Sequence, residues 1–282
     1  MRVQGSKMPK HSFTCNICGA RQQAEIASFG RETPTCGSCH STVRYRSLIH
    51  NLSLALFDRS MTLPDFPKNR DIRGVGMSDW DGFAVPLAQK LDYTRTYFDQ
   101  EPRLDLKNPS EGLGGRYDFV LCSEVLEHVA TPVEPAFAGL AHLLKADGVL
   151  LLTVPYQINT GTIEHFPNLH EYSVTRVGNS YVLVNRTKDG AYEVFDKLNF
   201  HGGIGTTLEM RIFGEPDLMK NLSAAGFEQV TIEGEDYPPF GILFQERWSL
   251  PILARKQNAH QRKGMEKSVP ERAGARTSST SG

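Results

Sequence analysis

Two Cys-x-x-Cys pairs, Cys15/Cys18 and Cys36/Cys39, constrain the first part of this 282-residue chain more than any other feature. Each pair holds two thiols on one side of a tight turn, and two such turns supply the tetrahedral set of four sulfurs that Zn²⁺ prefers. Four protein ligands leave no position for water, so the pattern predicts a structural site. We therefore expect a zinc ribbon over residues 1–45.

Two other uses of these cysteines are weaker. Disulfides would need an oxidising compartment, but the first 14 residues contain no apolar run of the export-signal kind, which favours a reducing cytoplasm. His40 follows the second pair directly, so this segment also matches a c-type haem attachment pattern. Haem would require export and would leave Cys15 and Cys18 unexplained, so zinc is the prediction.

Composition limits the partners of the chain. The hydrophobic content of 39% is enough for a core, and no stretch is long enough to cross a membrane. A net charge of −1 argues against broad electrostatic capture of nucleic acid or anionic lipid. We expect no membrane partner, while local contact with nucleic acid stays open.

Short apolar runs alternate with helical patterns from residue 71 onward. Before it, apolar residues recur at helical spacing from 42 to 57 and predict a helix. We expect this helix and a linker, over residues 46–70, to connect the ribbon to the part that begins at residue 71. The ranges predicted as strands are 72–77, 94–98, 117–122 and 148–154, and those predicted as helices are 83–91 and 132–144. Such alternation indicates βαβ units and a doubly wound α/β sheet, whose ligands bind beyond the carboxyl ends of the strands.

The second half of the chain has a different pattern. It predicts strands at 181–184, 191–195 and 229–232, with a helix at 215–225 that Gly226 would end in a left-handed conformation. We expect the sheet domain to span residues 71–250. Residues 251–282 are polar and basic, and they predict a disordered tail.

The segment around Glu-Val-Leu-Glu-His, residues 124–128, carries a resemblance to a known family. It resembles the class I S-adenosylmethionine-dependent methyltransferases of the type 11 kind. In that family an aspartate opens the fourth strand, here Asp118, and a Lys-x-x-Gly element precedes the fifth, here residues 145–148. The resemblance covers residues 71–232 and implies a Rossmann-like methyltransferase fold that binds S-adenosylmethionine.

The resemblance places a glycine-rich cofactor loop at residues 73–80. Gly74 and Gly76 are present where three glycines are typical of the family. The register is open, because Gly76 can also be the first loop glycine, with Ser78 and Trp80 in place of the others. We assign Gly74, Gly76 and Ser78 to cofactor binding.

Acidic residues after the second predicted strand complete the implied cofactor site. Asp99 is expected to accept hydrogen bonds from the ribose hydroxyls, with Glu101 as the substitute if that strand ends later. Asp105 falls where the family contacts adenine, and an ordinary turn residue explains it equally well. Glu124, after the fourth strand, is also assigned to the cofactor.

Glu124, Glu127 and His128 have the i, i+3, i+4 spacing of one helical face. Such a set can hold a divalent cation or transfer a proton, and small-RNA and ubiquinone-pathway methyltransferases with a similar element use it for metal. His165 and His170 could close on the same pocket, so His128, His165 and His170 are the candidate bases. We prefer the interpretation that the element orients its helix without a second metal.

Together these features predict a cytoplasmic S-adenosylmethionine-dependent methyltransferase with a structural Zn²⁺, acting on a small-molecule or glycan-type acceptor. The glycines at 202, 203 and 205 could serve an acceptor-binding loop or a plain hairpin. One alternative is a methyltransferase for RNA or another macromolecule that binds through ribbon and tail. The other is a non-catalytic scaffold whose degenerate loop no longer holds the cofactor.

Overall fold

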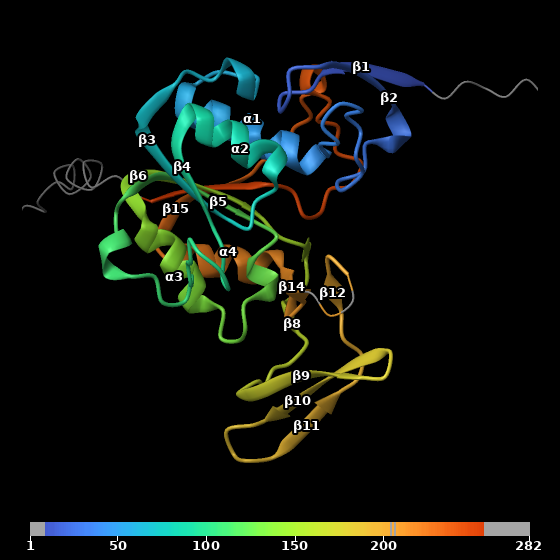
Figure 1. Cartoon of the computed structure of the whole chain (residues 1–282), viewed down its shortest axis with the longest axis vertical. Helices are drawn as coiled ribbons and strands as arrows, with labels where there is room; N and C mark the ends of the chain where they lie inside the picture. Colours follow the sequence, from blue (N-terminus) through green and yellow to red (C-terminus); the bar gives the residue numbers. More distant parts are fainter. Residues whose placement is uncertain (1–8, 204, 206, 257–282) are drawn as a thin grey trace, which may run out of the picture.

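A six-stranded sheet forms the centre of the computed structural model, which describes residues 9–203, 205 and 207–256 (Figure 1). The strand order is β15-β16-β6-β5-β3-β4. The four strands from β6 to β4 are parallel, β16 is antiparallel to β6, and β15 is antiparallel to β16. These strands are β3 (Asn69–Met77), β4 (Leu91–Thr96), β5 (Tyr117–Ser123), β6 (Leu144–Thr153), β15 (Phe227–Ile232) and β16 (Ile252–Lys256).

Helices cover both faces of this sheet and bury two cores. The helices are α1 (Val43–Phe57), α2 (Asp81–Lys90), α3 (Glu134–Leu143) and α4 (Glu215–Ala224). Side chains of α1 and α2 pack on one face around Phe119, and those of α3 and α4 pack on the other around Val120, because neighbouring residues of a strand point to opposite faces. The predicted doubly wound α/β class is confirmed. No helix in the described ranges is long and apolar enough to cross a bilayer.

The N-terminal module, which begins with the hairpin of β1 (Lys10–Thr14) and β2 (Arg21–Glu25) and the 3-10 turn η1 (Ile26–Ser28), shares a core with the sheet. Arg46 of α1 is fully buried and donates hydrogen bonds to the carbonyl oxygens of Ser41 at 2.8 Å and Gly241 at 2.9 Å. These bonds tie the module to α1 and to the chain before β16. One hydrophobic core therefore extends across the boundary predicted at residue 45.

A long insertion joins β6 to α4 and extends away from the N-terminal module (Figure 1). Its strands are β7 (Tyr156–Gln157), β8 (Ile163–Glu164), β9 (Glu171–Val177), β10 (Ser180–Arg186), β11 (Tyr192–Phe195), β12 (Phe200–His201), β13 (Thr207–Leu208) and β14 (Arg211–Gly214). The strands predicted near 181–184 and 191–195 exist as β10 and β11, but they form a separate three-stranded sheet with β9. A third core, which includes Phe166 and Leu183, packs against it.

The last strand corrects the predicted end of the sheet domain. Residues 252–256 were assigned to a disordered tail, yet they form β16, which lies between β6 and β15. Ile252 and Ala254 are buried, so this short alternating segment belongs to the core. The remainder of the predicted tail, residues 257–282, lies outside the described residues. Gly226 ends α4 with a φ of +94°, as predicted.

Candidate functional site

The order of the strands creates a topological switch point at the carboxyl ends of β3 and β5, where an open α/β sheet has its ligand crevice. From β3 the chain passes through α2 to β4 on one side, and β5 pairs with β3 on the other side. Because α2 and α3 pack on opposite faces of the sheet, the loops after β3 and β5 diverge at this point. Open parallel sheets bind ligands at such a switch point. The crevice is therefore the candidate functional site.

Gly74 and Gly76 both lie within β3, and Ser78 follows the end of this strand. Gly74 lies inside the strand, where a Cβ would fall 2.0 Å from the Phe119 ring, so its missing side chain makes room for packing. The assignment of Gly74 to cofactor binding stays a prediction. Ser78 follows the strand with a φ of +53°, a conformation that favours glycine, and its N–H donates to the Thr96 carbonyl at 2.8 Å. Ser78 thus stands at the second glycine position, counting from Gly76.

Asp79 is a buried acid in this loop that the sequence did not single out. The Tyr93 hydroxyl donates to its Oδ2, whereas Oδ1 has no hydrogen-bond partner within the described part of the chain. Its Oδ2 lies where a side chain on Gly76 would be, which explains why that position needs glycine. Burial raises the pKa of Asp79 to about 7.

This raised pKa predicts a specific pH dependence of stability. Between about pH 4 and pH 7 the folded state holds a proton on Asp79 that the unfolded chain releases, so stability falls as pH rises through this window. Asp79→Asn removes that dependence, and its free energy of unfolding should rise relative to wild type by up to about 4 kcal/mol between pH 4 and pH 8. Urea unfolding at both pH values measures the difference. A difference in free energy of unfolding between variant and wild type that is the same at both pH values would contradict this assignment. Asp99→Asn, which changes an exposed acid, is the control.

The acidic residues after β4 occupy different environments. Asp99 is exposed and lies three residues beyond the end of β4. The carboxylate of Asp105 accepts a hydrogen bond from the Lys107 backbone N–H at 2.9 Å, which is the ordinary turn role that the sequence left open. Glu101 caps the same loop by accepting from the Arg103 N–H at 3.0 Å. Asp99 and Glu101 are both exposed, and Asp99 is the nearer of the two along the chain to the end of β4.

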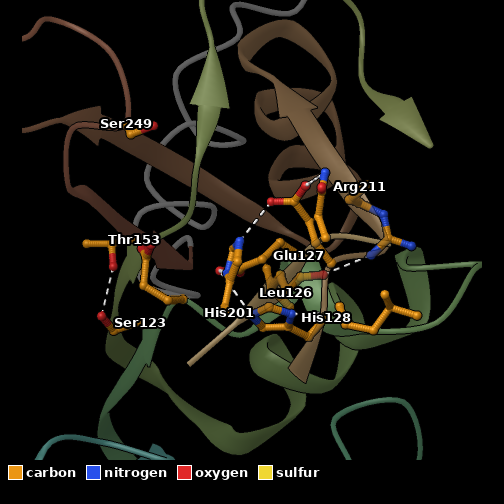
Figure 2. Close-up of polar contacts among 12 residues, drawn as sticks. Ser123, Leu126, Glu127, His128, Thr153, His201, Arg211 and Ser249 are labelled. Atoms are coloured by element: carbon orange, nitrogen blue, oxygen red, sulfur yellow. Dashed lines mark hydrogen bonds and ion pairs between the residues drawn. The ribbon is translucent and has the colours of Figure 1, made fainter. Parts of the chain in front are cut away.

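The loop after β5 is joined to the N-terminal module by two arginines. Arg31 donates to both carboxylate oxygens of Glu124, at 2.7 and 3.1 Å, and Arg44 donates to Ser123 Oγ at 2.6 Å. Ser123 also bonds Thr153 at the end of β6, at 2.8 Å (Figure 2). Glu124, assigned from the sequence to the cofactor, is paired with Arg31 here. Sequence reasoning missed both arginines as parts of this edge.

The helix expected over residues 124–128 does not form. Glu124 has a φ of +56°, and only the short 3-10 turn η4 (Leu126–His128) follows. Arg211 of β14 donates to the carbonyl oxygens of Leu126 at 2.8 Å and Val129 at 2.6 Å. Those carbonyls are therefore unavailable to a helix, and the three predicted residues do not share a helical face.

Glu127 and His128 instead meet His201, which β12 brings from the insertion (Figure 2). Glu127 Oε1 lies 3.5 Å from His128 Nε2 and 3.9 Å from His201 Nδ1. Burial raises the pKa of Glu127, and the nearby charge of Glu124 adds to this effect. The sequence flagged the loop of His201 for its glycines and did not connect it with Glu127.

The other two candidate bases do not join this cluster. His165 Nε2 lies 2.8 Å from Glu209 Oε1, and Glu209 also contacts His201 Nε2 at 2.9 Å. Glu209 therefore links His165 to His201 of the cluster. His170 is exposed and lines a separate open cavity of about 690 Å³ with Lys188. The prediction that His170 shares a pocket with His128 is therefore wrong.

The four cysteines of the N-terminal module converge as predicted. Their sulfurs all lie within 4.8 Å of one another, with 3.6 Å between Cys15 and Cys39 and 3.7 Å between Cys18 and Cys36. Disulfides require about 2.05 Å, so the cysteines are unbonded. Tetrahedral thiolates at 2.3 Å from zinc would stand about 3.8 Å apart, which fits the observed distances.

The residue after each pair explains the haem-like pattern. Gly19 has a φ of +77° and donates its N–H to the Cys15 carbonyl at 2.7 Å. His40 occupies the equivalent place after the second pair, with a φ of +60° and an N–H bond to the Cys36 carbonyl at 2.8 Å. His40 is exposed and completes the turn, so the Cys-x-x-Cys-His pattern arises from turn geometry.

Comparison with known proteins finds similar folds at low identity. No family model and no curated protein matches the sequence. Among solved structures, the chain is similar to the CurJ carbon methyltransferase (15% identity, TM-score 0.44, 76% of this chain and 55% of that one). It is also similar to CalS10, an amino pentose methyltransferase from Micromonospora echinaspora whose structure contains bound S-adenosylmethionine (14% identity, TM-score 0.42, 76% of this chain and 90% of that one). A third similar structure is the sugar N-methyltransferase KedS8 from Streptoalloteichus sp ATCC 53650 (13% identity, TM-score 0.39, 66% of this chain and 81% of that one). The chain thus spans about half the length of the first of these proteins.

Proposed function

We propose that this chain is an S-adenosylmethionine-dependent methyltransferase that acts on a small-molecule or glycan-type acceptor. The observation that carries the proposal is the topological switch point at the carboxyl ends of β3 and β5, where a ligand crevice is expected. Its rim contains a left-handed Ser78 and a buried Asp79 on one side and the polar end of β5 on the other. Backbone at such a crevice can approach a nucleoside-bearing cofactor closely.

The residues at the crevice fit this cofactor in charge and hydrogen bonding. The unpartnered Oδ1 of Asp79 can accept from a cationic amino group, which the methionine part of the cofactor carries. We assign Asp99, which is exposed just after β4, to accept hydrogen bonds from the ribose hydroxyls. When bound, the cofactor supplies a methyl group already activated on a sulfonium, so the protein contributes mainly by positioning.

The insertion supports a small or uncharged acceptor. Residues 156–214 contain five Lys and Arg against six Asp and Glu, so the segment next to the crevice has no excess of positive charge. A macromolecular acceptor with a phosphate backbone would favour such an excess.

The N-terminal module is proposed to hold one structural Zn²⁺ on its four cysteine sulfurs. The observed sulfur distances support this ligand set, and four thiolates leave no open coordination position. Unbonded thiols in this number are typical of a reducing compartment, and this supports a cytoplasmic location.

Calorimetry with S-adenosylmethionine tests the proposed function. The wild type should bind, and Asp99→Ala should weaken binding by about 1–3 kcal/mol, because the ribose hydroxyls lose their acceptor. Glu101→Ala is the matched control on the same loop and should bind like the wild type. Absence of wild-type binding would refute the proposal and leave a scaffold role. Salt-sensitive RNA binding would instead favour the macromolecular acceptor.

A further inference from the structure

We propose that Glu127, His128 and His201 form a second metal site that binds a divalent transition-metal ion. One ligand atom of each residue lies within 4.8 Å of those of the other two. The site is separate from the four cysteines and draws on two distant segments, η4 and the β12 hairpin. It replaces the expectation that this element serves only to orient a helix.

The carboxylate of Glu127 lacks the partner that its burial demands. Its side chain is fully buried, and neither oxygen has a hydrogen-bond partner among the described residues. An isolated carboxylate in such surroundings is costly unless a cation or several donors neutralise it. The nearest side-chain nitrogens belong to the two histidines, at 3.5 and 3.9 Å, which is too long for a good hydrogen bond.

Both histidines present their ring nitrogens in the way that metal ligands do. His128 Nδ1 lies 2.9 Å from the Leu208 carbonyl oxygen, which can only accept, so Nδ1 carries the hydrogen and Nε2 presents a lone pair. His201 Nε2 lies 2.9 Å from Glu209 Oε2, so Nδ1 is the nitrogen that faces Glu127. A metal-bound histidine commonly donates its outer N–H to a carbonyl or a carboxylate.

The distances within the cluster suit a bridging ion. Ligands at about 2.1 Å from a tetrahedral zinc stand about 3.4 Å apart. The separation between Glu127 Oε1 and His128 Nε2 is 3.5 Å, and that to His201 Nδ1 is 3.9 Å. Both separations are thus close to those of neighbouring ligands on one ion.

A surrounding set of polar contacts fixes the ligands in place. Glu209 binds His165 as well as His201, and Arg211 holds both ends of the turn that carries Glu127 and His128. Arg211 is itself oriented by Glu164 through two contacts, at 2.5 and 3.2 Å. Such outer contacts restrict ligand orientation and support metal affinity.

The donor set identifies the class of ion. Two imidazoles and one carboxylate suit Zn²⁺, Mn²⁺, Fe²⁺ or Co²⁺, whereas Mg²⁺ and Ca²⁺ prefer oxygen ligands alone. Three protein ligands also leave a coordination position for water or another oxygen ligand, in contrast to the closed cysteine site.

Metal analysis of the full chain tests the proposal without any activity assay. After loading with Zn²⁺ and removal of unbound metal, the wild type should contain about two zinc ions per chain, and His201→Ala about one. His170→Ala, a histidine of the insertion outside the cluster, is the matched control and should keep two. His201 is part-exposed on its hairpin, and circular dichroism checks that the variant folds.

A second readout assigns the ion that is lost. Co²⁺ in the cysteine site gives intense thiolate charge-transfer absorption, and Co²⁺ on nitrogen and oxygen ligands gives only weak visible bands. His201→Ala should lose the weak bands and keep the thiolate absorption. One zinc per wild-type chain, or two in both wild type and His201→Ala, would overturn the proposal.

Discussion

Replacing Cys36 with serine is expected to remove the proposed structural zinc ion and to destabilise the whole chain. Structural zinc sites carry on the order of 10 kcal/mol of apparent binding free energy, and a site with three thiolates loses much of it. Because Phe13, Cys15 and Phe29 belong to the same core as α1, the loss should not stay within the module. We expect the free energy of unfolding to fall by at least about 3 kcal/mol, measured by urea titration beside metal analysis.

Cys122→Ala is the control for this variant. Cys122 is buried in the core on the α3 side and lies outside the cysteine cluster, so this variant should keep the structural zinc. A Cys36→Ser protein with the full zinc content would contradict the assignment. Iron, haem or intact disulfides in the wild type would contradict it as well.

Arg211→Met is expected to be the most damaging single change in the insertion. The guanidinium is fully buried and joins the Glu164 carboxylate to the carbonyl oxygens of Leu126 and Val129. Methionine fills a similar volume but leaves the carboxylate and two carbonyls without their donor. Breaking one partner of a buried pair costs about 3–5 kcal/mol, and we expect a fall of this size in the free energy of unfolding.

Arg186→Met provides the matched comparison. Arg186 pairs with Glu171 at 3.0 Å on the exposed sheet of the insertion, with both side chains more than half exposed. Pairs of this kind contribute about 0–1 kcal/mol, so this variant should unfold close to wild type. Equal effects of the two substitutions would show that Arg211 does not hold the turn after β5.

The fold could be predicted from the sequence because its signals are local. Strand and helix periodicity located β3, β5, β6 and α1 to α4, and the cysteine spacing located the module. The segment of β16 escaped because it is short and lies at the edge of a polar region. It becomes a strand only through pairing with β6 and β15, which no local pattern reveals.

The site was harder to predict because long-range contacts override local propensity. Residues 124–128 have good helix formers, yet Arg211, more than eighty residues away, takes the carbonyls that a helix would use. The cluster of Glu127 with His201 depends on the same insertion. The sequence also could not show that Gly74 makes room for the Phe119 ring, because this is a contact between neighbouring strands.

A crystal structure of the full chain with S-adenosylhomocysteine is the most direct test of the methyltransferase assignment. The account predicts that the ligand lies in the crevice between the carboxyl ends of β3 and β5. Its amino group should be within hydrogen-bond distance of Asp79, and its ribose hydroxyls within reach of Asp99. Ligand bound elsewhere on the molecule, or a crevice that stays without ligand at saturating concentration, would contradict the account.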